Sequence, residues 1–234
     1  MVFAPQPDPV DPGARMTYRG SGLDHLDPDV APLEVLRAWY TDATRDHRIS
    51  EAAAMVVATV DRDGLPNART VLLKRLDASG LVFYTNTEST KADELAARPV
   101  AAAVLPWHPM FRQVRARGRV EPVSRADAEA YFQSRPRDSQ IAAWASAQSR
   151  PLAHRDELVQ AVHSMEQRFA GQHVLPLPPF WGGYLLRPVE IELWVGMESR
   201  LHDRWAWVAV DDSAGGVPAA LDQAHQWRVQ RRQP

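Results

Sequence analysis

Residues 55–85, MVVATVDRDGLPNARTVLLKRLDASGLVFYT, decide the fold class. The hydrophobic residues take a period of two here, which is the spacing of a half-buried strand. Met55–Val60, Arg69–Arg75 and Leu81–Thr85 are predicted strands, and the segments DRDG and DASG between them are turn signals. Strands joined by tight turns pair antiparallel, because a parallel pair needs a long crossover. The stretch therefore predicts an antiparallel meander.

The rest of the chain adds strands and helices to this meander. Alternating or apolar segments predict strands at Val100–Leu105, Phe111–Val120, from Trp181 onward, Val189–Val195, Arg204–Val210 and Trp227–Val229. Capping residues and prolines predict helices at 32–47, 89–98 and 124–135, a helix with Asp138 or Ser139 as its N-cap, and a helix at 149–171. About eight short antiparallel strands favour a closed or partly split barrel. We therefore expect an α+β protein, mainly β, built on a split β-barrel with flanking helices.

The composition is that of a soluble globular protein. The chain has 234 residues, of which 45% are hydrophobic and 24% charged. Its net charge of −2 argues against nucleic-acid binding, and its apolar runs are too short to span a membrane. The N-terminus lacks the features of a secretory signal, so we expect a cytoplasmic location. Residues 1–14 hold four prolines and are expected to be a disordered leader, followed by a single domain at 15–234.

Several kinds of active site are excluded by residue type. The chain contains no cysteine, which excludes disulfides, thiolate catalysis and zinc–thiolate sites. The eight histidines show no metal-binding spacing such as HExxH, so we predict no metal. Neither a P-loop nor a Gly-x-Ser-x-Gly nucleophile motif occurs.

Tyr131–Ser149 combines groups that suit an anion. A helix ending at Arg135 would place Tyr131 and Arg135 on one face of its last turn, because Pro136 disfavours helical geometry in the residue before it. A second helix would begin directly afterwards and present free backbone N–H groups. A guanidinium beside a helix N-terminus suits a phosphate. Two surface helices around a proline turn are the alternative interpretation.

Two other charged segments are candidate sites. Arg69 and Lys74 are five apart on a predicted strand, so they should point to opposite faces and address two anionic partners. The alternative is that both reach into water from the strand ends. Arg200–Arg204, with the sequence RLHDR, is predicted to be a hairpin turn in which Arg200, His202 and Arg204 share one direction if the segment is extended. An ordinary polar turn is the alternative there.

Six motifs occur in the order seen in one enzyme family. They are RTVLLK at 69–74, FYTN at 83–86, RQV at 112–114, SRPRDSQ at 134–140, PFWGG at 179–183 and RLHDR at 200–204. In these motifs the chain resembles the pyridoxamine 5′-phosphate oxidase family, over residues 15 to 210. The resemblance implies a homodimer of split β-barrels with FMN bound at the subunit interface.

The resemblance also implies roles for individual residues. The residues that match the family's FMN site are Arg69, Thr70, Val71, Leu72, Leu73, Lys74, Tyr84, Thr85, Thr90, Lys91 and Gln113, with Gln148, Ser149, Trp194 and Arg204 contributed by the partner subunit. The residues that match the substrate site are Lys74, Tyr131, Arg135, Ser139, Arg200 and His202, with Arg15 and Tyr18 as an N-terminal lid. Arg200 and His202 are the candidate catalytic residues, because they match the pair that holds the substrate's pyridine ring against the flavin.

The implied activity is oxidation of pyridoxamine or pyridoxine 5′-phosphate to pyridoxal 5′-phosphate, with O₂ reduced to H₂O₂. A related flavin oxidase of another substrate, such as a dihydrophenazine, is one alternative, and a non-catalytic flavin- or haem-binding split barrel is another. A phosphate clamp made of Lys74, Tyr131, Arg135 and Ser139 favours the first activity, because an unphosphorylated substrate has no use for it. Thr90 departs from the arginine that the family often has there, which should weaken one contact to the FMN phosphate.

Overall fold

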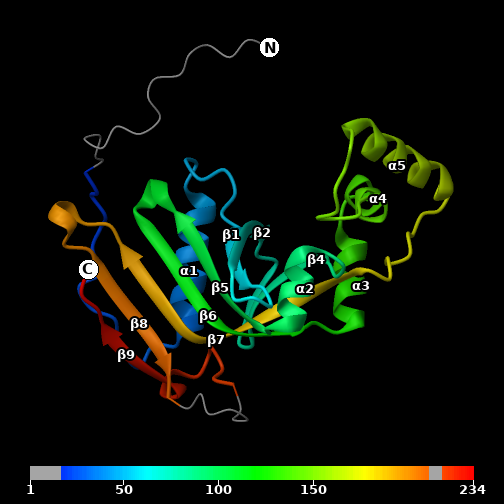
Figure 1. The fold of residues 1–234 in the computed structure, drawn as a ribbon. Helices are drawn as coiled ribbons and strands as arrows, with labels where there is room; N and C mark the ends of the chain where they lie inside the picture. Colours follow the sequence, from blue (N-terminus) through cyan, green and yellow to red (C-terminus); the bar gives the residue numbers. More distant parts are fainter. Residues whose placement is uncertain (1–16, 211–217) are drawn as a thin grey trace.

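The computed structural model describes residues 17–210 and 218–234. The expected leader and Arg15 therefore lie outside the described residues. Within the described part, nine strands form one antiparallel sheet and five α-helices flank it (Figure 1). No helix in that part is both long enough and apolar enough to cross a membrane.

The sheet has the strand order β2-β1-β5-β6-β7-β4-β3, and β8 and β9 continue it from β7. All of its pairings are antiparallel, as the turn signals predicted. The strands are β1 (Ala54–Val60), β2 (Pro66–Leu72), β3 (Arg75–Asp77), β4 (Gly80–Asn86), β5 (Val100–Trp107), β6 (Arg112–Pro122), β7 (Trp181–Val195), β8 (Asp203–Ala209) and β9 (Trp227–Arg231).

β7 is the strand at which the sheet divides. On one side β6 pairs with almost its whole length, whereas the other side is shared: β4 pairs with residues 181–186 and β8 with residues 190–195. Pro188, which has no N–H to donate, lies between these two segments, and the register against β6 shifts beside it, at Arg117 and Gly118. Such an irregularity bends a sheet. The result is the split barrel expected from the sequence.

Two strand predictions differ from the structure. The predicted strand Arg69–Arg75 is two strands, because β2 ends at Leu72 and β3 begins at Arg75. The two strand segments predicted after Trp181 are one continuous strand of 15 residues. The two differences cancel in the strand count, and the described sheet has nine strands, against the approximate estimate of eight.

The helices lie close to their predicted positions, with two corrections. The last helix begins at Arg155 and not at Ser149, whose φ of 71° is left-handed. The helix after Pro136 has that proline as its N-cap, so Asp138 and Ser139 lie inside its first turn. The helices are α1 (Pro32–Arg45), α2 (Thr90–Ala97), α3 (Arg125–Ser134), α4 (Arg137–Ala145) and α5 (Arg155–Arg168).

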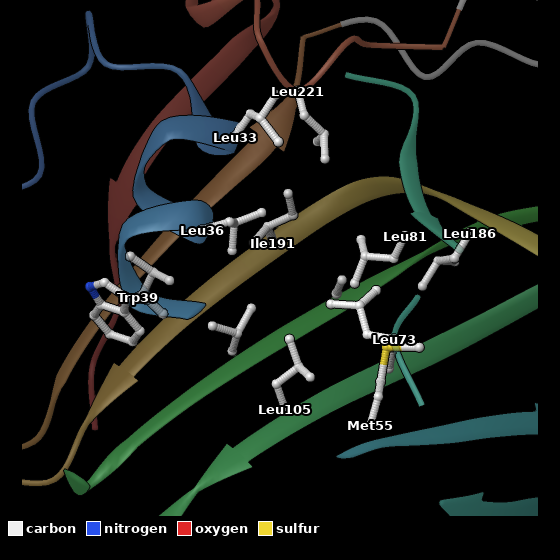
Figure 2. Packing of buried hydrophobic residues seen from close by; sticks show 14 of the residues in the cluster. Leu33, Leu36, Trp39, Met55, Leu73, Leu81, Leu105, Leu186, Ile191 and Leu221 are labelled. Carbon is white, nitrogen blue, oxygen red and sulfur yellow. The ribbon is translucent and has the colours of Figure 1, made fainter. Parts of the chain in front are cut away.

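Two hydrophobic clusters position the helices. In the larger cluster, α1 buries Leu33, Leu36 and Trp39 against residues of the sheet such as Ile191 (Figure 2). The smaller cluster lies among α3, α4 and α5 and is made of Ala128, Phe132, Ile141, Phe169, Leu175, Leu177 and Trp181. Because Trp181 is also the first residue of β7, this cluster attaches the three helices to the start of that strand, and Figure 1 shows them grouped at that end of β7.

Candidate functional site

A cavity of about 500 Å³ opens between β2, β4, α2 and the α3–α4 connection. Its lining includes four cations, Arg69, Lys74, Lys91 and Arg135, and no carboxylate among the described residues. A concave surface with only positive charges attracts anionic ligands. The other residues that line the cavity are Thr70, Val71, Leu72, Tyr84, Thr85, Asn86, Tyr131, Ala142, Ala143, Ser146, Gln148 and Trp181.

Lys91 is the buried cation of this cavity. It lies in the first turn of α2, and its Nζ donates to Gln148 Oε1 at 2.6 Å, Thr85 Oγ1 at 3.0 Å and Ser89 Oγ at 3.1 Å. Burial, and then the nearby Arg69, lower the pKa of Lys91 to about 8. All three acceptors are neutral, so the ammonium group has no anion bonded to it. A bound phosphate would supply that missing anion.

Arg69 is held beside the cavity by Glu94. The guanidinium donates to Glu94 Oε2 at 2.8 Å and to Thr59 Oγ1, and Asn67 donates to the second oxygen of Glu94 at 2.8 Å. Burial raises the pKa of Glu94, but hydrogen bonds from Thr59, Asn67 and Arg69 bring it below its ordinary value. The ionised Glu94 fixes the position of Arg69 and offsets part of its charge. Lys91 therefore carries the less compensated charge of the two.

Another wall of the cavity consists of aromatic rings and Arg135. The rings of Tyr84 and Tyr131 stack with centroids 4.1 Å apart, and Trp181 stacks on Tyr84 at 5.5 Å. Arg135 is the C-cap of α3, and its guanidinium carbon lies 5.1 Å from the centroid of the Trp181 ring. Its Nη1 atom is buried and has no hydrogen-bond partner among the described residues. A guanidinium N–H without a partner suits a phosphate oxygen.

The expectation that Arg69 and Lys74 point to opposite faces is wrong. Both line the same cavity, because β2 ends at Leu72 and the alternation of a strand does not continue to Lys74. The cavity thus gathers residues predicted for the FMN phosphate and residues predicted for the substrate phosphate.

Apart from Tyr18 and the predicted residues on and around β6, β7 and β8, four predicted site residues do not line this cavity. Leu73 is 5% exposed and belongs to the hydrophobic core. Thr90 and Ser149 are exposed, and Ser139 is the third residue of α4. Gln148, which was expected to act across the subunit interface, lines the cavity of its own chain and bonds to Lys91 there.

A second group of predicted residues lies on β6, β7 and β8. Gln113 is paired with Trp194, and Trp194 with Arg204, so the three form one row across neighbouring strands. Arg204 donates through Nη2 to both oxygens of Glu192, at 3.0 Å each. Glu192 is 3% exposed, and it also accepts a hydrogen bond from Arg232 in the C-terminal segment. A buried carboxylate therefore fixes the direction of Arg204.

Tyr18 and His202 extend this second group. The ring of Tyr18 packs edge-on against Trp194, with centroids 5.7 Å apart, and against His202 at 5.6 Å. The backbone N–H of Met197 donates to His202 Nδ1 at 3.0 Å, so a neutral His202 carries its proton on Nε2. The N-terminal segment is thus packed beside the histidine, where a lid was expected.

The three side chains Arg200, His202 and Arg204 were expected to share one direction if their segment is extended. The segment is not extended at Arg200. Ser199 and Arg200 have φ angles of 56° and 63°, in the left-handed region. This conformation is uncommon outside glycine, and strained backbone of this kind is concentrated at functional sites. Arg200 is exposed, and none of the second group's residues lines the cavity described above. One chain therefore carries two separate groups of predicted site residues.

Residues 41–169 match the family model described as pyridoxamine 5′-phosphate oxidase. The chain belongs to the pyridoxamine 5′-phosphate oxidase family. Residues 181–234 match the model described as the pyridoxine 5′-phosphate oxidase C-terminal dimerisation region, which supports a homodimer. Family membership confirms the expected split barrel and FMN as the cofactor, and it makes the chain a flavin oxidoreductase.

Curated relatives and solved structures agree with this membership. The chain is 46% identical to the pyridoxine/pyridoxamine 5′-phosphate oxidase of Shewanella frigidimarina over 84% of this chain and 92% of that protein. It is 45% identical to the Kineococcus radiotolerans enzyme of the same name, over 95% and 98% of the two chains. The structure of PhzG from Burkholderia lata, in complex with tetrahydrophenazine-1-carboxylic acid, has a TM-score of 0.77 at 26% identity and covers 91% of this chain and 99% of that one.

Three residues of this family member's site were missed by motif analysis. Glu94 and Glu192 fix Arg69 and Arg204, and Trp181 lies against Arg135. Trp181 stands in the PFWGG motif, but nothing in the sequence connects it with Arg135. One unused signal is lysine usage: the chain has two lysines, Lys74 and Lys91, and both line the cavity.

FMN binding should weaken as the pH rises through about 8, the pKa of Lys91. A phosphate favours the charged lysine, so above this pH the free protein must take up a proton when it binds FMN. We expect the Kd for FMN to rise about fivefold from pH 8 to pH 9. Titration of the apoprotein with FMN by flavin fluorescence measures this, and Lys91→Gln should show no such rise. A wild-type Kd that is constant over this range would contradict the prediction.

Proposed function

We propose that this protein is an FMN-dependent oxidase that converts pyridoxamine 5′-phosphate, pyridoxine 5′-phosphate or both to pyridoxal 5′-phosphate, with reduction of O₂ to H₂O₂. The observation that carries the proposal is a single cavity lined by four cations and, among the described residues, by no carboxylate. We assign Lys91 to one phosphate together with Arg69, which is near enough to lower the pKa of Lys91, and we assign Tyr131, Arg135 and Lys74 to the other. A flavin cofactor accounts for one phosphate, and a phosphorylated substrate accounts for the other.

The protein's own residues bind and orient. Lys91 and Arg69 would hold the FMN phosphate, and the orphaned Nη1 of Arg135, the Tyr131 hydroxyl and Lys74 would hold the substrate phosphate. Ser139 follows Pro136 in the first turn of α4, where backbone N–H groups are free, and it is proposed to complete this clamp. Bound FMN supplies the electron acceptor and the route to O₂. Orientation then matters most, because the donor carbon must approach within about 3–3.5 Å of its acceptor.

We further propose that the functional site is completed by dimerisation. The second group, with Gln113, Trp194 and Arg204, lies apart from its own cavity and within or beside the matched dimerisation region. In a homodimer this group would face the cavity of the other subunit. There Arg200 and the Nε2–H of His202 would hold the pyridine ring, with Tyr18 covering it.

A dihydrophenazine oxidase is the second candidate, favoured by the similarity to PhzG. Its substrate would bring no phosphate ester to Arg135. We therefore rank it below the phosphorylated vitamers, and a non-catalytic flavin- or haem-binding barrel below both.

Two other expectations remain proposals: a single domain over residues 15–234, supported by the continuous sheet from β1 to β9, and a cytoplasmic location.

Peroxide formation tests the proposal. Purified protein is loaded with FMN and assayed with pyridoxamine 5′-phosphate, with pyridoxine 5′-phosphate and with their dephosphorylated forms. We expect peroxide and pyridoxal 5′-phosphate with at least one phosphorylated vitamer, and little with the dephosphorylated forms. Turnover of a dihydrophenazine but of neither vitamer would select the second candidate, and a protein that turns over neither class would be the non-catalytic one.

A further inference from the structure

Arg135 differs from Arg69 and Arg204 in what holds it. Arg69 is bonded to Glu94, and Arg204 to Glu192, so each gives hydrogen-bond donors to a carboxylate. Arg135 has no ion pair with any described residue. Its guanidinium instead lies over two rings, 5.1 Å from the centroid of Trp181 and 5.9 Å from that of Phe132.

The two ways of holding an arginine have different consequences. A carboxylate occupies the N–H edge of the guanidinium, so a phosphate must compete for the same donors. An aromatic ring contacts the flat face and leaves the N–H edge free. Arg135 therefore keeps its donors available, which agrees with its unpartnered buried Nη1. Burial also lowers the pKa of Arg135, but a guanidinium stays charged at any physiological pH.

The ring of Trp181, which contacts the flat face of Arg135, is itself held in place by its neighbours. Its side chain is 6% exposed and stacks on both Tyr84 and Tyr131, with interplanar angles of 4° and 13°. Its carbonyl oxygen accepts a hydrogen bond at 3.1 Å from Arg125, which also binds the carbonyls of Leu177 and Pro178. Since Arg125 begins α3 and Arg135 caps its end, the same helix carries the arginine and anchors the ring beneath it.

We propose that Trp181 is a positioning residue that selects phosphorylated substrates by holding Arg135 through its flat face. The inference rests on the proposed function, because it assigns Arg135 to the substrate phosphate. Trp181 would not touch the phosphate itself. It would keep the guanidinium in one orientation in the cavity, beside the Tyr131 ring that stacks on the same indole at 5.9 Å.

Equilibrium binding tests this without any turnover. FMN-loaded protein is titrated with pyridoxal 5′-phosphate and with pyridoxal by calorimetry. The Kd for pyridoxal divided by the Kd for pyridoxal 5′-phosphate measures what the phosphate contributes to binding, and this quotient is the ratio used below. Trp181→Met fills most of the ring's volume but lacks its flat face, whereas Trp181→Phe keeps a smaller face. We expect Trp181→Met to lower the ratio about tenfold and Trp181→Phe to lower it less than threefold, in line with a partly desolvated cation–π contact. In an Arg135→Ala background, Trp181→Met should change the ratio no further.

Three results would overturn the inference. One is that Trp181→Met weakens both ligands equally, as a purely structural role predicts. Another is that its full effect persists without Arg135, and the third is that the phenylalanine variant is as impaired as the methionine variant. Bound FMN and circular dichroism establish that each variant is folded, and Trp181→Leu replaces Trp181→Met if the latter does not fold. If wild-type protein binds pyridoxal 5′-phosphate tightly but oxidises neither vitamer, the proposed function fails while this inference stands.

Discussion

Arg135→Ala is expected to raise the KM for the phosphorylated vitamer by about 30- to 160-fold, since losing a charge-assisted contact costs about 2–3 kcal/mol. The arginine lines the cavity, has an unpartnered Nη1 and forms no ion pair with a described residue, so its removal leaves no carboxylate unpaired. The substitution should therefore leave FMN content and folding unchanged. Steady-state kinetics with peroxide detection measures KM and kcat, and the absorbance of released flavin measures cofactor content.

A matched control separates this effect from a general loss of positive charge. Arg155 is an exposed arginine at the start of α5 and does not line the cavity, so Arg155→Ala should leave KM unchanged. Loss of FMN from the Arg135 variant would show that Arg135 serves the cofactor's phosphate instead. An unchanged KM would remove Arg135 from the substrate site altogether.

Lys91→Met is expected to weaken FMN binding by about 100-fold, because the variant loses a buried charge-assisted contact worth about 3 kcal/mol. The apoprotein itself should be as stable as wild type or more stable. Lys91 is 7% exposed in the wild type and its ammonium is bonded only to neutral acceptors, and burying a charge without an anionic partner costs stability. Titration of the apoprotein with FMN and thermal denaturation without FMN measure the two effects.

Arg98→Met is the control for this second substitution. Arg98 is the C-cap of the same helix, α2, and donates to the backbone carbonyl of Arg62 outside the cavity. It should lose no affinity for FMN. If Lys91→Met bound FMN as tightly as wild type, Arg69 would have to be the main phosphate ligand despite its ion pair with Glu94.

Much of the fold was predictable because its signals are local. The period of two and the DRDG and DASG turns determine strands that pair antiparallel, and Pro136 ends α3 at Ser134 with Arg135 as its cap. The boundaries that failed were those set by distant partners. β7 is one strand because β6 accompanies almost its whole length, although β4 and β8 share its other side. Pro188 marks the point where the two partners change, but the partners themselves come from distant parts of the chain.

For the site, too, the local sequence predicted some features, and contacts between distant residues decided the others. The sequence by itself determined the family, through six motifs in order, and with it the cofactor, and it predicted the residues of two phosphate sites. Only the tertiary structure decided that Arg69 and Lys74 line one cavity, that Glu94 holds Arg69, and that Trp181 lies under Arg135. The physical reason is distance along the chain: Trp181 and Arg135 belong to different elements, and only the packing of α3 against the start of β7 brings ring and guanidinium into contact.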